Sequence, residues 1–147
     1  MKKVLTLISL LLMFVAVSCD NTDSALTEMA KLANEKCPLQ IDYLTTMDKV
    51  EYDPASKRYI YYYTIDDNVL PMTSLMQNSK TLAENIKNQL NNPSEEMEKE
   101  LEALKAADAI IEYYYTGENT GKSFYIRYNP EDKNCVITLS ADEVIKV

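Results

Sequence analysis

The 147-residue sequence contains no histidine and only two glycines, Gly117 and Gly121. Without histidine the chain cannot form a Ser-His-Asp or Cys-His catalytic centre, and it cannot bind zinc, copper or iron through imidazole. Two glycines are also too few for a glycine-rich loop that binds phosphate. Carboxylates therefore offer the only enzymatic route, in which a pair of acidic side chains acts as acid and base.

Metal and cofactor sites are equally hard to find in this composition. Asp66 and Asp67 precede Asn68, and Glu131 precedes Asp132, but neither group has the ligand spacing of an EF-hand calcium loop. The cysteines are not spaced as a metal or redox motif. We interpret the two acidic groups as turns, and we expect no cofactor and no metal.

The first 19 residues combine the features of a leader. Lys2 and Lys3 form a basic start, residues 4–17 form an apolar run that is too short to span a membrane comfortably, and small residues lead to Cys19. The segment "AVSC" resembles the lipobox of bacterial lipoproteins, in which the peptidase cuts before a lipidated cysteine. An ordinary secretory signal that contains a cysteine by chance is the alternative.

The lipobox resemblance implies domain boundaries and a location. Residues 1–18 would be a lipoprotein signal peptide, residues 19–24 the lipidated Cys19 with a short tether, and residues 25–147 a single α+β domain. Acyl chains on Cys19 would hold the protein on a membrane of the cell envelope, with the domain outside the cytoplasm. Asp20 fits either inner-membrane retention or surface export, so the choice of membrane stays open.

The acidic excess argues against nucleic acid as a partner. Loss of residues 1–18 leaves 129 residues with 13 basic and 23 acidic side chains, a net charge of −10. Such a chain repels nucleic acid and anionic headgroups. Its length is that of one domain with one hydrophobic core.

Two cysteines, Cys37 and Cys135, remain after lipidation of Cys19. An envelope compartment permits disulfides, so we expect a bridge between them, with two buried free thiols as the alternative.

Hydrophobic periodicity predicts helices and hairpins in separate groups. Helical spacing indicates one helix that ends near residue 36, a second that begins at Pro71 and a third, Glu-rich helix after Pro93. These groups favour an α+β fold: an antiparallel sheet of four to five strands with helices on one face, in the order α-β-β-α-α-β-β-β. The predicted strands cover residues 44–52, 58–65, 109–116, 122–129 and 135–140.

The Glu-rich helix is expected on the surface of the domain. Met97, Leu101 and Leu104 form a narrow apolar stripe at helical spacing. Acidic residues crowd around this stripe: Glu95, Glu96, Glu98, Glu100 and Glu102.

Two Tyr-Tyr-Tyr-Thr runs, residues 61–64 and 113–116, place tyrosine on both faces of a strand because successive side chains alternate. One face is predicted to be core: Tyr59, Tyr61, Tyr63, Ile65, Ile111, Tyr113, Tyr115, Phe124, Ile126 and Tyr128. The other contains the charges and is a candidate binding face: Arg58, Ile60, Tyr62, Glu112, Tyr114, Tyr125 and Arg127. Tyr and Arg are enriched at interfaces, but ordinary cross-strand pairing on a solvated sheet is the plainer interpretation.

The segments "LANEKCPLQID", "LTTMDKVEYD" and "YYYTID" resemble a pattern of small, functionally uncharacterised bacterial envelope proteins. The resemblance implies a small α+β fold without an established activity, so no functional residue is carried over. The matching positions are Ala33, Asn34, Pro38, Ile41, Asp42, Thr46, Val50, Tyr61 and Tyr63.

These features favour a lipid-anchored, non-enzymatic envelope protein that binds or inhibits a macromolecular partner. The partner would be an envelope protein, an incoming enzyme or a glycan. One alternative is a carboxylate-dependent hydrolase that acts on envelope polymers, which requires two acidic side chains in one pocket. The other is a structural lipoprotein without a specific ligand.

Overall fold

The computed structural model describes residues 21–140 and 143–147. In these residues a single seven-stranded sheet, with strands in the order β1-β2-β3-β4-β5-β6-β7, is combined with four helices. The helices are α1 (Thr22–Asn34), α2 (Met72–Gln77), α3 (Ser79–Asn91) and α4 (Glu95–Ala106). The strands are β1 (Leu39–Gln40), β2 (Thr45–Asp53), β3 (Arg58–Ile65), β4 (Ile110–Gly117), β5 (Ser123–Asn129), β6 (Asn134–Ser140) and β7 (Glu143–Lys146).

The predicted antiparallel sheet of four to five strands is wrong. The sheet is mixed, because β3 and β4 pair in parallel while the other neighbours pair antiparallel. Parallel neighbours need a crossover connection, and the segment that contains α2, α3 and α4 provides it. The short strands β1 and β7 extend the two edges, so the order along the chain is α-β-β-β-α-α-α-β-β-β-β.

The two Tyr-Tyr-Tyr-Thr runs lie side by side at the centre of the sheet. The parallel pairing of β3 and β4 places Tyr61 next to Tyr113 and Tyr63 next to Tyr115. The ring centroids of these pairs are 5.5 Å and 5.4 Å apart, and the rings are nearly parallel. Each run therefore supplies the stacking partners of the other, an arrangement that stabilises neighbouring strands.

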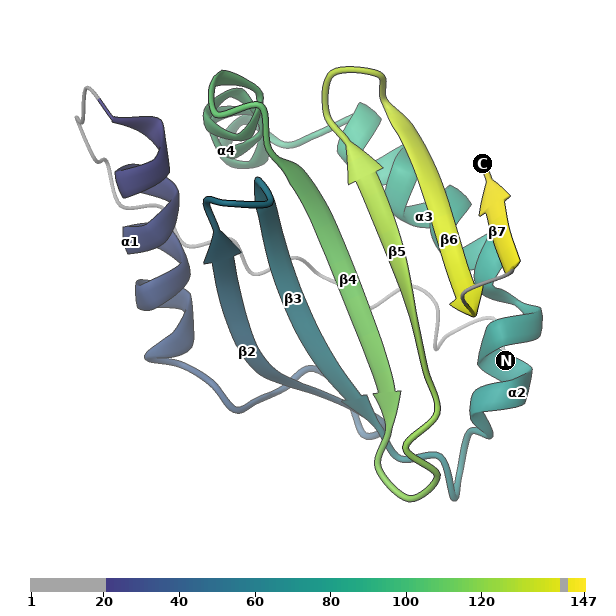
Figure 1. Ribbon diagram of the computed structural model, residues 1–147. Coiled ribbons are helices and arrows are strands. Elements are labelled where there is room, and N and C mark those ends of the chain that lie inside the picture. The colour runs from purple at the N-terminus through teal and green to yellow at the C-terminus, as the bar shows by residue number, and fades with distance from the viewer. Residues whose placement is uncertain (1–20, 141–142) are drawn as a thin grey trace.

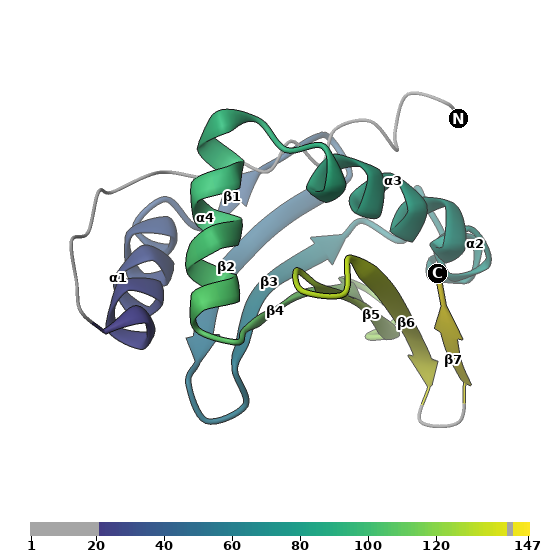
Figure 2. The same cartoon turned by 90° about the horizontal axis from the view of Figure 1, so that it is seen from above.

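All four helices lie on one side of the sheet (Figure 1). The contacts place α1 against β2 and α4, and α3 against β6. Seen from above, the sheet is arched, with the helices along its outer side and its inner side bare of the described helices (Figure 2). We call this bare side the open face.

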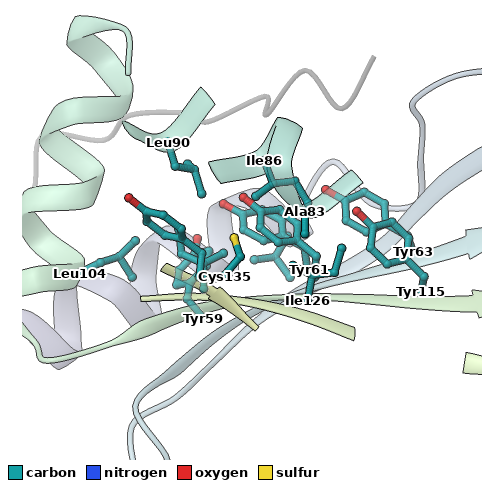
Figure 3. Packing of buried hydrophobic residues seen from close by; sticks show 14 of the residues in the cluster. Tyr59, Tyr61, Tyr63, Ala83, Ile86, Leu90, Leu104, Tyr115, Ile126 and Cys135 are labelled. Atoms are coloured by element: carbon teal, nitrogen blue, oxygen red, sulfur yellow. The ribbon is translucent and has the colours of Figure 1, made fainter. Parts of the chain in front are cut away.

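The core lies between the sheet and the helices. The ten side chains assigned to the core face by strand alternation are all buried, which confirms that part of the prediction. The rings of β3 and β4 project toward Ala83, Ile86 and Leu90 of α3 (Figure 3). Leu104 of α4 is fully buried near Tyr59 at the other end of this cluster (Figure 3).

The helix predicted after Pro71 is two helices that meet at Asn78. The side-chain amide of Asn78 donates to the carbonyl oxygen of Ser74 at 2.7 Å, a local hydrogen bond that competes with helix continuation.

Candidate functional site

The register of the strands assembles a row of three tyrosines across the open face. Tyr62 of β3 pairs with Tyr114 of β4, which pairs with Tyr125 of β5. The same register adds Lys49 of β2 at one end and Thr138 of β6 at the other. We call Tyr62, Tyr114 and Tyr125 the tyrosine row; its members are half-buried and, by the register of their strands, lie on the side of the sheet opposite the four described helices.

The rings of the tyrosine row contact one another and two cations. The centroids of Tyr62 and Tyr114 are 5.6 Å apart, and those of Tyr114 and Tyr125 are 6.3 Å apart. Lys49 Nζ lies 4.3 Å from the ring centroid of Tyr62, and the guanidinium carbon of Arg127 lies 4.5 Å from that of Tyr125. These are cation–π distances, so a cation covers a face of each outer ring.

Glu112 organises the charges beside the row. Its carboxylate oxygen Oε2 accepts from Arg127 Nε at 2.6 Å and from Arg58 Nη1 at 3.3 Å. Arg58 and Arg127 are the only arginines in the chain. Glu112 is just 4% exposed, because the two arginines cover it, and Ile60 beside it is equally buried. The structure therefore places all seven residues of the candidate binding face together on the open face.

A small hollow lies at the β5–β6 side of the row. It has a volume of about 190 Å³ and is lined by Tyr114, Tyr125 and the hydroxyl residues Ser123, Thr138 and Ser140, among others. The Tyr114 hydroxyl donates to Ser123 Oγ at 3.1 Å. The sequence interpretation missed the β6 residues of this hollow, although their alternation in "CVITLS" was a usable signal.

A second hollow lies where β2 and β3 meet the loops. It has a volume of about 380 Å³, and its lining includes Tyr43, Asp48, Asp66 and Glu118. Tyr43 is 73% exposed, the most exposed large apolar side chain among the described residues. Asp48 Oδ2 accepts from the Thr64 hydroxyl at 2.5 Å.

Glu100 departs from the expected solvated position on the Glu-rich helix. It is 3% exposed, and its Oε1 accepts from the Tyr61 hydroxyl at 3.1 Å. Burial raises the pKa of Glu100 to about 7, although the hydrogen bond from Tyr61 opposes this shift. Helical spacing was a usable signal for this burial, because Glu100 lies three residues after Met97 and four before Leu104, on the apolar stripe of the helix.

Asp67 lies in the predicted turn, and its carboxylate also binds the loop that follows β4. Its carboxylate accepts from the Asn119 backbone and side-chain amides at 2.9 Å and 3.0 Å, and from the Thr120 hydroxyl at 2.5 Å. The Thr120 hydrogen bond, helped by those from Asn119, holds the pKa of Asp67 well below its usual range. Asp67 therefore ties the loop after β4 to the end of β3.

The expected disulfide is absent, since Cys37 and Cys135 are both free thiols. Cys37 follows α1 near the β2 edge, whereas Cys135 lies in β6, four strand spacings or roughly 19 Å from β2. A bridge requires Cα atoms within about 7 Å. Burial raises the pKa of both thiols, that of Cys135 to about 11.

Cys19 and the leader lie outside the described residues, so their lipidation stays a prediction. Within residues 21–140 and 143–147, no helix has the length and apolar character needed to cross a membrane. The same residues contain no cluster of three acidic, cysteine or histidine side chains suited to a metal ion.

The mixed sheet with helices on one side and a braced tyrosine row on the other defines a small α/β domain with an uncovered sheet face. The chain belongs to the family described as "Domain of unknown function (DUF8479)", which matches residues 20–125. No curated protein matches the chain. A similar solved structure is the crystal structure of a candidate secreted protein from Pseudomonas aeruginosa. It shares 14% identity at a TM-score of 0.59, over 78% of this chain and 98% of that one, which shows a common fold.

Proposed function

We propose that this protein is a lipid-anchored, non-enzymatic module of the cell envelope that binds a macromolecular partner through its open face. The observation that carries the proposal is the tyrosine row, which lies on the sheet face that the described helices leave uncovered. Lys49 and Arg127 lie over its outer rings, and Glu112 holds Arg127 in place. Pre-ordered aromatic and arginine side chains lose little conformational entropy on binding.

The location rests on two independent supports. The leader resembles that of a lipoprotein, with Cys19 at the expected cleavage point. The Pseudomonas aeruginosa protein with the same fold is described as a candidate secreted protein, which agrees with a place outside the cytoplasm. Mass spectrometry of the mature N-terminal peptide tests the anchor: acyl mass on Cys19 is expected, and a Cys19→Ser variant should lose it.

The placement of the carboxylates favours a binding module over a carboxylate-dependent hydrolase. Glu100 has a pKa near neutral, as a catalytic acid would, but it is packed beneath α4 against Tyr61. The hollow near Tyr43 does bring Asp48, Asp66 and Glu118 together, but Glu100, the carboxyl group with the raised pKa, is not among its lining residues.

Partner capture from intact cells tests the proposed function. The full-length protein carries a crosslinker and is compared with a folded Tyr62→Ser/Tyr114→Ser variant, and Tyr43→Ser serves as the control for loss of an exposed tyrosine. We expect a partner that the parent and the control retain and the double variant loses.

Each other outcome is informative. Loss with Tyr43→Ser alone would move the site to the hollow that Tyr43 lines. Equal capture by all three proteins would remove the open face as the site. Absence of any partner would favour a structural lipoprotein without a specific ligand.

A further inference from the structure

We propose that the open face binds an acidic segment of a protein partner, and that Arg127 and Lys146 together hold one of its carboxylates. This inference rests on the proposed binding function, and it names the chemistry of the ligand.

Arg127 is pre-oriented as a carboxylate receptor. Its Nε donates to Glu112 Oε2 at 2.6 Å, and its guanidinium lies over the ring of Tyr125. These two contacts fix the plane of the guanidinium while the side chain stays 36% exposed. Within the described residues its terminal amino groups donate to no acceptor, so one edge of the guanidinium fork is available to a carboxylate.

Lys146 adds a second cation on the same face. Arg127 pairs with Val136 of β6, which pairs with Lys146 of β7, so the register assigns the three residues to the same side of the sheet. At this edge of the sheet Lys146 also lines a hollow that it shares with Lys80, Glu84 and Lys87 of α3. The Cα atoms of Arg127 and Lys146 are two strand spacings apart, roughly 10 Å, and both side chains are long enough to meet over Val136. Lys146 is exposed and forms no ion pair in the part of the chain that the structure describes.

The local charge favours an anion at this place. Glu112 is the carboxylate nearest in register, and it is shared between Arg58 and Arg127. No acidic residue occupies the row from Arg127 across Val136 to Lys146. This cationic pair stands out in a chain with a net charge of −8, which repels a long polyanion such as nucleic acid but can accommodate a short acidic segment.

The tyrosine geometry favours a peptide over a sugar. A sugar ring stacks on an open aromatic face, and cations cover a face of both Tyr62 and Tyr125. The neighbouring hollow offers the hydroxyls of Ser123, Thr138 and Ser140, which suit the carbonyl groups of an extended peptide.

Fluorescence anisotropy with the full-length protein in detergent tests this inference. The probes are a labelled twelve-residue peptide of alternating Glu and Ser, its Gln-for-Glu counterpart, and a labelled hexamer of N-acetylglucosamine. The ionic strength is about 0.15 M, where long-range charge effects are screened beyond about 8 Å. We expect the Glu peptide to bind about tenfold more tightly than the Gln peptide, as one charge-assisted hydrogen-bonded contact predicts.

Single substitutions test how much each basic residue contributes to binding of the Glu peptide. Arg127→Gln and Lys146→Gln should each weaken binding of the Glu peptide about tenfold, and Arg127→Lys should weaken it because it lacks the fork. Lys105→Gln, which removes an exposed charge from α4, should leave binding unchanged. Arg127→Gln leaves the buried Glu112 without its closest ion-pair partner, which can destabilise the fold. Lys146 lies in an exposed edge strand, so Lys146→Gln tests the inference without that complication.

The inference is overturned by equal affinity for the two peptides, by no binding of the Glu peptide, by binding of the sugar hexamer alone, or by unchanged binding in both Gln variants. Its failure is distinguishable from failure of the proposed function. If Tyr62→Ser/Tyr114→Ser loses the captured partner while Lys146→Gln and Arg127→Gln keep it, the binding function stands and the acidic ligand is wrong.

Discussion

The side chain of Asn34 forms two hydrogen bonds with the backbone of Val50. Its Nδ2 donates to the Val50 carbonyl oxygen at 2.6 Å, and its Oδ1 accepts from the Val50 N–H at 2.7 Å. The neighbouring strand β1 pairs with β2 only at Met47 and Thr46, so Val50 lies beyond its reach. Asn34 thus takes the place of a strand at this edge and attaches the end of α1 to the sheet.

The Asn34→Ala variant should lower the free energy of unfolding by about 1–3 kcal/mol, because it leaves both backbone groups of Val50 without their partner. Chemical denaturation measures this change, and Lys31→Ala on the exposed side of α1 is the control. A loss no larger than that of the control would show that water replaces the amide without cost.

Glu100 should make stability depend on pH. Its pKa is about 7 in the folded protein and near 4.5 in the unfolded chain, so this group favours folding most at low pH. Between these values the unfolded chain releases the proton while the folded protein keeps it, and about 3 kcal/mol of stability is lost as pH rises from 4.5 to 7.

The Glu100→Gln variant should remove this loss, since glutamine still accepts from Tyr61 and carries no charge. We expect it to exceed the parent in stability at pH 8 by up to about 3 kcal/mol and to match it at pH 4. Denaturation curves across this range provide the test, with the exposed Glu98→Gln as control. Parallel stability profiles of parent and Glu100→Gln would contradict a buried carboxyl.

Gly117 should not tolerate a side chain. A Cβ at this position would overlap Asp67 Oδ2 and would lie 2.6 Å from Met72 Cγ. The Gly117→Ala variant should therefore be destabilised by about 1–3 kcal/mol, because Asp67 must leave the loop that it holds or α2 must shift. Thermal unfolding measures the effect. Gly121→Ala is the comparison variant. A Cβ at Gly121 would have no atom within 4 Å, so that variant adds only the backbone strain of a side chain at a φ of +65°.

The two described cysteines should differ in reactivity and should not be linked. Cys135 is fully buried with its pKa raised to about 11, whereas Cys37 is half-buried. The thiolate is the reactive form, so alkylation of the folded protein should be slow at Cys37 and should reach Cys135 only on unfolding. Peptide mass spectrometry reads each site separately. A linked peptide containing both cysteines would refute the free-thiol state.

Alternation along each central strand is sufficient to predict which of its two sides is buried. Alternation in "RYIYYYTI", "IIEYYYT" and "SFYIRY" separates apolar and aromatic residues from charged ones, and a period of two needs no knowledge of the neighbouring strand. The same rule brought Tyr62, Tyr114 and Tyr125 to one face before any pairing was known.

Which strands become neighbours, and in which direction they pair, follows only from the packing of the whole domain. The parallel pairing of β3 with β4 depends on how the three crossover helices pack, which no local pattern encodes, and it sets Tyr62 beside Tyr114. Packing of α4 against the sheet buries Glu100, whereas the other glutamates of this helix stay exposed. The width of the sheet places Cys37 and Cys135 too far apart for a disulfide. Local periodicity fixes the direction of a side chain, whereas its partner is chosen by contacts between residues far apart in the sequence.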